Sequence, residues 1–175
     1  MLTISQVESE AQVASAEELL REYTEWVLTL TADSDKAPTF RGLHDELKTL
    51  PGVYAPPAGR LLLAMHDGQP AGCVCLKPHD AGTCELKRLY VRPTVRGLRV
   101  GWRLVNALVD EARRAGYSRM VLDSHITMKK AHAIYQAVGF RIMSTPDDFP
   151  EALRPFVIFM ECNLTAAADR GLQAP

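Results

Sequence analysis

The chain has 175 residues, a formal net charge of −1, 47% hydrophobic residues and 23% charged residues. These values are those of an ordinary soluble globular protein, and they give no general attraction to nucleic acid or to a membrane surface. No apolar run approaches the roughly 20 residues of a membrane-spanning helix, and residues 1–12 do not resemble a secretory signal, so we expect a cytoplasmic protein.

The first half of the chain predicts a strand, two helices and a hairpin. Residues 2–7 form the strand, and residues 31–42 form a loop before a short helix at 43–50. Strands at 61–65 and 71–76 flank an Asp67-Gly68 turn, which predicts the hairpin. The first helix spans residues 15–30, with Ser15 as its cap and Glu18 as the capping-box partner. Its apolar stripe contains Leu19, Leu20, Tyr23, Trp26, Val27 and Leu30.

The second half alternates strands with helices. A strand at 83–91 ends before Pro93, which has no N–H to donate, and an amphipathic helix runs from Val100 to a glycine cap at Gly116. A strand at 119–125, a helix at 128–139 capped by Gly139, and strands at 140–144 and 156–164 follow. We expect one domain over residues 1–164 and a flexible tail over 165–175. The order of elements indicates a mixed sheet carrying helices, hence an α/β or α+β fold.

The four cysteines, Cys73, Cys75, Cys84 and Cys162, show no C-x-x-C spacing. Cys73 and Cys75 share one face of a strand, where a disulfide between them is geometrically poor. We therefore expect buried, reduced thiols and no metal site. Cys84 and Cys162 lie in apolar strand patterns, which argues against a nucleophilic cysteine because such a thiol needs an exposed, electropositive setting.

The stretch "LYVRPTVRGLRVGWRLV" at 89–105 joins a strand to a helix through a short, basic, glycine-containing loop. Such a loop directs free backbone N–H groups of the helix N-terminus at one point, and this arrangement predicts an anion site. From Gly97 there is no Gly-Lys-Ser/Thr, so the loop is not a Walker loop. It also lacks the G-x-G-x-x-G of a dinucleotide-binding turn.

The strand, loop and helix of "ELKRLYVRPTVRGLRVG", followed by "AIYQAVGF", resemble the GCN5-related N-acetyltransferase superfamily from about residue 60 to 162. The acyl-CoA loop of that superfamily reads [Q/R]-x-x-G-x-[G/A], and here Arg96 takes the first position and Gly101 the last. Arg99 stands where the middle glycine usually is, and a backbone conformation with φ above zero would make it costly. The resemblance implies a single domain with a mixed, mostly antiparallel central sheet flanked by helices.

The resemblance also implies acetyl-CoA as the cosubstrate. Leu89, Tyr90 and Val91 would offer backbone groups to the pantetheine arm, and one of their amides would polarise the thioester carbonyl. Many relatives have an asparagine where this chain has Met128, so that contact is absent or is supplied by Thr127 or by backbone. The residues expected to wrap the pyrophosphate are Arg96, Gly97, Leu98, Arg99, Val100, Gly101 and Trp102.

Direct transfer to an amine in a ternary complex needs a base for the amine and an acid for the thiolate. Tyr135 matches the family's acid, and a core tyrosine is the alternative. Glu85 is the first candidate base, because one branch of the family carries a glutamate there. Strand alternation would place Glu85, Lys87, Leu89 and Val91 on one face, although Lys87 could instead hold Glu85 in an ion pair.

Asp123, at the end of the next strand, is the second candidate base, with a capping or loop role as the alternative. His125 is the third, although a loop histidine is more often solvated than catalytic. The amine-bearing acceptor stays unidentified: a small amine, an amino acid, an antibiotic or a protein N-terminus. Candidates for lining its cleft are Tyr23, Trp26, His44, Glu46 and Tyr54, of which Tyr23 and Trp26 also fit a core stripe. Asp45 and Glu46 could attract a cationic amine, with a solvated helix face as the alternative, and Arg154 and Phe156 are equally open.

A rival interpretation from another class is a module that binds acyl-CoA as a sensor or scaffold without turnover. The departures at Arg99 and Met128 favour it, whereas Tyr135 and Glu85 argue against it. Arginines concentrate at positions 88, 92, 96, 99 and 103, and a nucleic-acid-binding role for this arginine cluster is disfavoured because the net charge provides no basic face. Strands near the C-terminus offer an edge for a possible homodimer.

Overall fold

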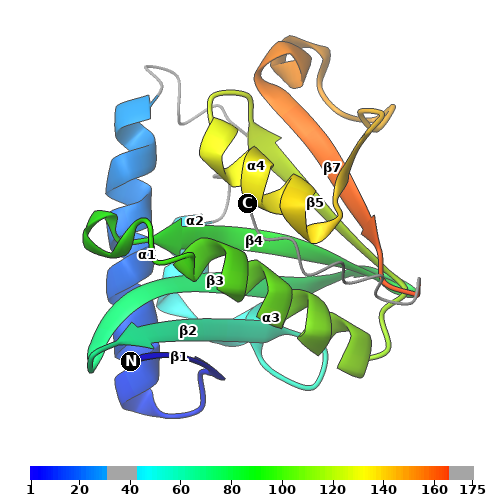
Figure 1. Ribbon diagram of the computed structural model, residues 1–175. Helices are drawn as coiled ribbons and strands as arrows, with labels where there is room; N and C mark the ends of the chain where they lie inside the picture. The colour runs from blue at the N-terminus through cyan, green and yellow to red at the C-terminus, as the bar shows by residue number, and fades with distance from the viewer. Residues whose placement is uncertain (31–42, 166–175) are drawn as a thin grey trace.

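The computed structural model describes residues 1–30 and 43–165 and contains a seven-stranded sheet in the order β1-β2-β3-β4-β5-β7-β6 (Figure 1). Neighbouring strands are antiparallel except for β4 and β5, which are parallel. The mixed, mostly antiparallel sheet is therefore confirmed. The strands are β1 Leu2–Gln6, β2 Arg60–His66, β3 Gln69–Asp80, β4 Thr83–Val91, β5 Arg119–His125, β6 Arg141–Met143 and β7 Val157–Asn163.

Helices cover both faces of the sheet. In Figure 1, α3 and α4 lie in front of the strands, whereas α1 runs behind them. The helices are α1 Glu10–Leu30, α2 Leu43–Lys48, α3 Val100–Arg114 and α4 Lys129–Val138, with short 3-10 turns η3 Gly52–Tyr54, η4 Pro93–Val95 and η5 Glu151–Phe156. Two apolar cores result, one between the sheet and α1 and the other between the sheet and α3 with α4.

The elements of the second half follow the prediction closely. The apolar stripe of α3 is buried against the sheet, as its spacing predicts. Gly116 follows α3 with φ 86°, and Gly139 caps α4 with φ 110°. Both are left-handed conformations that glycine adopts without the steric penalty of a Cβ atom.

The start of α1 differs from the prediction. The helix begins at Glu10 rather than Ser15, and the capping box is formed by Ser9 and Gln12. The backbone N–H of Gln12 donates to Ser9 Oγ at 3.3 Å, while the side-chain Oε1 of Gln12 accepts from the backbone N–H of Ser9 at 3.0 Å. Ser15 lies inside the helix and its hydroxyl donates to the Ala11 carbonyl. Ser9-x-x-Gln12 therefore takes the capping role predicted for Ser15-x-x-Glu18, six residues earlier in the chain.

One strand is longer than predicted, and two predicted segments lie outside the described residues. The hairpin strand predicted at 71–76 extends over Gln69–Asp80. The loop predicted at 31–42 and nearly all of the predicted tail, 166–175, lie outside the described residues, as do the side chains of Leu30 and His44. No helix in the described ranges is both long and apolar enough to cross a bilayer.

A β-bulge at Arg88 changes the face that each β4 residue occupies. The register between β3 and β4 shifts between Cys73 and Cys75, and Arg88 has φ 58°. Leu86 and Leu89 consequently both pack toward α3 and α4, although they are three residues apart. The prediction that Glu85, Lys87, Leu89 and Val91 share a face is therefore wrong: the bulge places Leu89 and Val91 on the face of Leu86, opposite Glu85.

The parallel pairing of β4 with β5 is short. Only Thr83–Glu85 pair with Arg119–Val121, and beyond these residues the two strands diverge (Figure 1). Among the residues that the structure describes, no strand pairs with the gap-facing edge of β4 from Leu86 to Val91. The candidate site occupies this gap.

Candidate active site in the gap between β4 and β5

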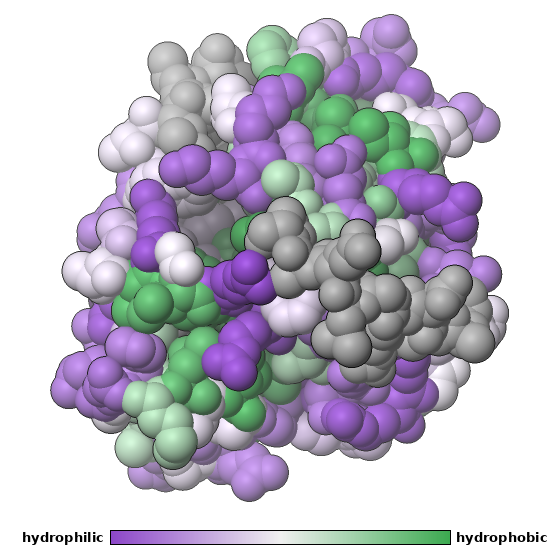
Figure 2. Space-filling view, in the orientation of Figure 1, coloured by the Kyte–Doolittle hydropathy of each residue, from purple (hydrophilic) through white to green (hydrophobic). Residues whose placement is uncertain are grey.

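A cavity of about 790 Å³ opens beside the divergent ends of β4 and β5. On the face shown in Figure 2 the molecule is hollowed between α1 and α4, and hydrophilic side chains gather on the rim. All of the predicted cofactor-binding residues line this cavity except Leu98, which is 48% exposed and lies outside it. The predicted residues that do line it are Leu89, Tyr90, Val91, Arg96, Gly97, Arg99, Val100, Gly101 and Trp102.

The loop before α3 positions backbone amides at one wall of the cavity. Gly97 has φ 93° and Arg99 has φ 56°, and Arg99 is the N-terminal cap residue of α3 without a side-chain capping hydrogen bond. Because the first amides of a helix have no intrahelical acceptor, this wall is suited to an anion. The conformation anticipated as costly for Arg99 is the one it adopts, with a penalty of about 1–2 kcal/mol.

Gly101 lets the two helices at the cavity approach each other. A Cβ atom at this position would lie 3.0 Å from Cδ1 of Ile134 on α4 and 3.5 Å from Cγ2 of Val91. Contacts as short as the first require the neighbour to move. The last glycine of the loop motif therefore leaves room for the Ile134 side chain between α3 and α4.

Three arginines of the cluster differ in what they face: Arg92 faces α1, whereas Arg96 and Arg99 face the cavity. Arg92 binds Glu18 at 2.6 Å and Glu22 at 2.7 Å on α1, and the hydrogen bond and charge of Arg92 lower the pKa of Glu22. Arg96 and Arg99 instead line the cavity, next to the N-terminus of α3. The positive charge at the cavity is therefore local, and Arg92 holds α1 against the end of β4.

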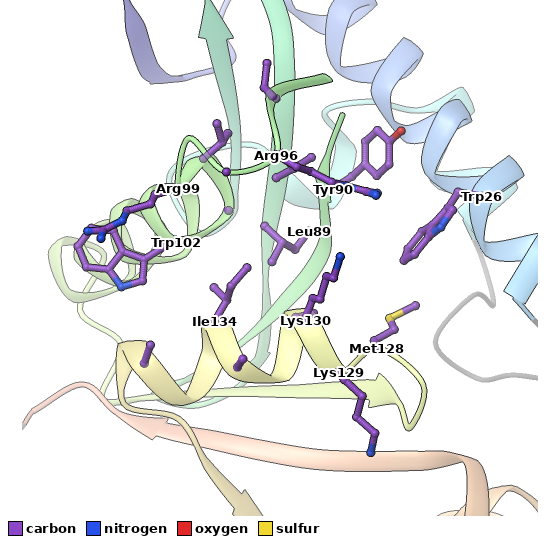
Figure 3. Close-up of a pocket in the computed structure, with 18 of the residues that line it drawn as sticks. Trp26, Leu89, Tyr90, Arg96, Arg99, Trp102, Met128, Lys129, Lys130 and Ile134 are labelled. Atoms are coloured by element: carbon purple, nitrogen blue, oxygen red, sulfur yellow. The ribbon is translucent and has the colours of Figure 1, made fainter. Parts of the chain in front are cut away.

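Two lysines and an indole from other elements complete the cavity. Lys129 and Lys130, at the start of α4, were not anticipated by the motif (Figure 3). The amine of Lys130 points up across the cavity in front of Leu89, whereas Lys129 points away from it. Trp26 faces this region from α1.

A second cavity of about 50 Å³ adjoins the first and lies deeper in the gap. The two share Trp26, Leu89, Met128 and Ala131, so the small cavity continues the large one. The chemically functional side chains of the site gather here. The other residues that line it are Tyr23, Leu86, Lys87, Arg88, Asp123, Ser124 and Tyr135.

Tyr135, the predicted acid, lies in the small cavity with 6% of its surface exposed. Burial raises its pKa well above the ordinary value of 10, and the nearby Tyr23 and Asp123 add to the shift. The phenol is therefore protonated at neutral pH. Its ring also packs on Phe140, with 5.8 Å between ring centroids, so it belongs to the core as well as to the cavity.

Of the candidate bases, Glu85 lies outside both cavities and Asp123 lines the small one. Glu85 binds Lys87 at 2.9 Å and Lys77 at 3.2 Å, so the ion pair considered as the alternative for Glu85 is present. Asp123 accepts from Lys87 Nζ at 3.1 Å. Lys87 thus bridges the two carboxylates across the point where β4 and β5 separate.

His125 is neither solvated nor in either cavity. It is 5% exposed, its Nδ1 lies 2.8 Å from the Thr127 hydroxyl, and its ring stacks on Phe156. Burial lowers its pKa below the ordinary value of 6.5. The contacts indicate that His125 shapes the turn into α4.

Sequence reasoning missed Ser124 and His132. Ser124 Oγ and His132 Nε2 are 3.0 Å apart, both residues are buried, and Ser124 lines the small cavity. The one available signal was the position of His132, three residues before Tyr135, which places both on the sheet-facing side of α4. The apolar spacing of the helix predicts that Ala131, Ile134, Tyr135 and Val138 face the core, and all four do; His132 is buried beside them.

The proposed acceptor-side residues separate into three groups. Tyr23 and Trp26 line the cavities although they belong to α1. Glu46 and Tyr54 instead form a buried network behind the small cavity, in which Arg88 Nε donates to Glu46 at 3.0 Å and Tyr54 donates to the same carboxylate at 2.8 Å. Asp45, Arg154 and Phe156 do not line either cavity.

The cysteines provide no activated nucleophile. All four thiols are free and buried. Burial raises the pKa of Cys73 and of Cys84 to about 12, which is the opposite of the shift that a reactive thiolate requires. Within residues 1–30 and 43–165, no three His, Cys, Asp or Glu side chains group in a way that could hold a metal ion.

Comparison with known proteins gives the same architecture and a family. The sequence profile described as Acetyltransferase (GNAT) family matches residues 16–140. An uncharacterized N-acetyltransferase of Schizosaccharomyces pombe is 37% identical over 129 residues, which cover 73% of this chain and 77% of that protein.

Solved structures share the fold at lower sequence identity. The PaiA N-acetyltransferase of Thermoplasma acidophilum in complex with coenzyme A has a TM-score of 0.71 at 18% identity, covering 93% of this chain and 99% of that one. The yncA protein of Salmonella typhimurium, solved with its cofactor acetyl-CoA, has a TM-score of 0.65 at 22% identity, covering 95% and 96%.

Proposed function

The chain belongs to the GNAT family of acetyltransferases, and from this premise we propose that it moves an acetyl group from acetyl-CoA directly to a primary amine, without an acyl-enzyme. The observation that supports the proposal most is the continuity of the two cavities. The large cavity has an anion-binding wall at one end, and its other end leads to the buried Tyr135 and Asp123.

The seat proposed for acetyl-CoA follows from the gap in the sheet. The pantetheine arm lies along the free edge of β4, where backbone groups of Leu89, Tyr90 and Val91 take the place of a strand partner. The pyrophosphate lies at the N-terminus of α3, with Arg96 and Arg99 beside it. The binding of coenzyme A or acetyl-CoA by two proteins of the same fold supports this arrangement.

The thioester then lies at the entrance to the small cavity, between Leu89 and Met128. An amide at the β4 bulge polarises its carbonyl and stabilises the oxyanion of the tetrahedral intermediate. Tyr135 gives its proton to the departing thiolate, for which a phenol of pKa above 10 is a competent donor that stays protonated beforehand.

Asp123, rather than Glu85, is proposed as the carboxylate that receives the amine. Asp123 lines the small cavity, whereas Glu85 is held between two lysines outside it. An alkyl ammonium of pKa about 10 is only about a thousandth neutral at pH 7, so it must lose a proton before it can attack. Asp123 attracts the ammonium group and passes that first proton to solvent.

The test is thiol release from acetyl-CoA with a panel of amines: tryptamine, L-amino acids, kanamycin and short peptides with free N-termini. Tyr135→Phe and Asp123→Asn are compared with wild type, and each has a matched control. Tyr117→Phe removes a hydroxyl that donates to the Ala58 carbonyl away from both cavities, and Asp80→Asn removes an exposed carboxylate at the end of β3 that lines neither cavity. Binding of acetyl-CoA is measured in parallel by calorimetry.

We expect turnover to fall in Tyr135→Phe and in Asp123→Asn by about 10²–10⁴-fold, with acetyl-CoA affinity and both control variants unchanged. Tight binding of acetyl-CoA without release of its thiol in the presence of any amine would instead identify the sensor alternative, which the methionine at position 128 favours. A protein that does not bind acetyl-CoA would refute both.

A further inference from the structure

Ser124 and His132 form a buried hydrogen-bonded pair at the wall of the small cavity. Ser124 Oγ lies 3.0 Å from His132 Nε2, and the residues are 2% and 8% exposed. The same hydroxyl lies 3.7 Å from the sulfur of Met128, but an imidazole nitrogen is a far better acceptor than a thioether. The hydroxyl proton therefore points at the histidine, and the oxygen lone pairs remain available to the cavity.

His132 is prepared to accept a proton. Burial lowers its pKa below the ordinary value of 6.5, and the charge of Lys129 on the same helix lowers it further. A backbone hydrogen bond to His125 opposes this shift, and the ring of His125 adds a smaller lowering. The imidazole is neutral at pH 7, with a hydrogen bond at each end that holds its orientation.

The chemistry of the site leaves one proton unassigned. An acceptor ammonium loses two protons during acetylation, one before its nitrogen attacks and one after the C–N bond has formed. The carboxylate of Asp123 accounts for the first. The second departs from a nitrogen already joined to the acyl carbon, deep in a cavity that contains no further carboxylate among its described lining residues.

We propose that Ser124 and His132 form the proton relay for this second step. This inference rests on the proposed function and adds to it the path of one proton. As the C–N bond forms and the C–S bond breaks, the amine N–H proton passes to Ser124 Oγ. The original hydroxyl proton of Ser124 passes to Nε2 of His132, and the thiolate takes the phenol proton of Tyr135.

The relay balances charge within the buried site. Donation by Tyr135 alone would leave a phenolate in surroundings that disfavour it. With the relay, an imidazolium forms three residues away on the same face of α4, so that the two charges appear together. The proton then returns from His132 to Tyr135, and the enzyme is restored without any other reactant.

The test separates proton acceptance from hydrogen bonding. In His132→Gln a side-chain amide oxygen can accept from Ser124 but cannot take its proton, and in Ser124→Ala the link is removed. His79→Gln, at an exposed position on β3, is the control. Each variant is assayed with acetyl-CoA and the most active amine of the panel, alongside thermal melting and acetyl-CoA affinity.

We expect kcat/KM to fall about 10²–10⁴-fold in His132→Gln and Ser124→Ala, with acetyl-CoA affinity within twofold of wild type. The double variant should be no slower than the slower single variant, because the two side chains act as one unit. Activity within twofold of wild type in a folded His132→Gln would overturn the relay.

The pH profile provides a readout that does not depend on how the variants fold. In wild type, log(kcat/KM) should rise with a slope of about two below the pKa of His132 and about one above it, because both the histidine and the amine must be deprotonated. The other titratable or charged groups that face the site are Asp123, Lys87, Arg88, Tyr135 and Tyr23 of the cavity and Lys129 and His125 beside the ring. In His132→Gln only the slope of about one should remain.

A wild-type profile without the break, or a break that persists in His132→Gln and so belongs to Asp123, would refute the relay. These results differ from a failure of the proposed function. In that case the wild type itself would release no thiol with any amine of the panel.

Discussion

Replacing Arg99 with glycine and with alanine measures the strain in the loop before α3. Arg99 has φ 56° and ψ 23°, in the left-handed region. An L-residue there carries a penalty of about 1–2 kcal/mol that glycine escapes. Glycine also has more conformational freedom in the unfolded chain than alanine, which lowers the stability of the glycine variant by about 0.4–1 kcal/mol. We therefore expect Arg99→Gly to be more stable than Arg99→Ala by about 1 kcal/mol.

For a chain of this length, about 1 kcal/mol corresponds to a difference of roughly 2–4 °C in Tm. Thermal melting and urea unfolding of the two variants measure it directly. The comparison isolates the backbone, because both variants lose the guanidinium and every contact it makes. A loop in which Arg99→Ala is as stable as Arg99→Gly does not contain the left-handed residue described here, and the argument from backbone strain would then be refuted.

The same pair of variants separates stability from binding. Both remove a positive charge from the cavity, so the KM for acetyl-CoA should rise by a similar factor in each, and the increase should shrink at high salt. A KM that rises in only one of them would mean that the loop conformation, rather than the charge, determines affinity.

Two further predictions concern the buried network behind the small cavity. Glu46→Ala leaves the Arg88 side chain, which is 1% exposed, without this carboxylate, and should lower the free energy of unfolding in urea by about 3 kcal/mol. Asp45→Ala, at a side chain 84% exposed, should lower it by under about 1 kcal/mol. Equal losses in the two variants would contradict the network. Burial raises the pKa of Glu46, but the hydrogen bond and charge of Arg88 outweigh this effect and hold the pKa below 4.5. The stabilisation from Glu46 is therefore present above pH 4.5 and is lost as the pH falls through the lower pKa of the folded state. When Tm is measured from pH 6 to pH 3, it should fall less steeply in Glu46→Gln than in wild type.

The strand and helix positions around the site could be predicted from sequence because they depend on local signals. The ends of β4 at Thr83 and Val91 follow from the apolar run and from Pro93, and the cap of α4 follows from Gly139. The loop motif located the large cavity for the same reason, since its geometry depends on a few neighbouring residues. Leu98, which is exposed and does not line the cavity, shows that a motif does not specify which of its residues face a ligand.

The small cavity could not be predicted in the same way. Its faces depend on the bulge at Arg88, where no glycine or proline signals the irregularity, and the alternation argument for Glu85 failed for that reason. Ser124 and His132 meet only because α4 packs on β5, which is a tertiary contact with no local pattern. The start of α1 was misplaced because two capping boxes are present in the sequence and the earlier one forms.

The short seam between β4 and β5 divides the sheet mechanically. Strands β1 to β4 form one hydrogen-bonded block and β5, β7 and β6 another, and β4 and β5 join the blocks through a ladder of three residue pairs. Cofactor bound along the edge of β4 would act as a further strand between the blocks and stiffen the junction. Alternate amides of β4 already face β3, so only those amide hydrogens of Leu89–Val91 that face the gap should exchange slowly in the presence of acetyl-CoA and quickly without it. The cofactor would then complete the sheet on binding and open it again on release.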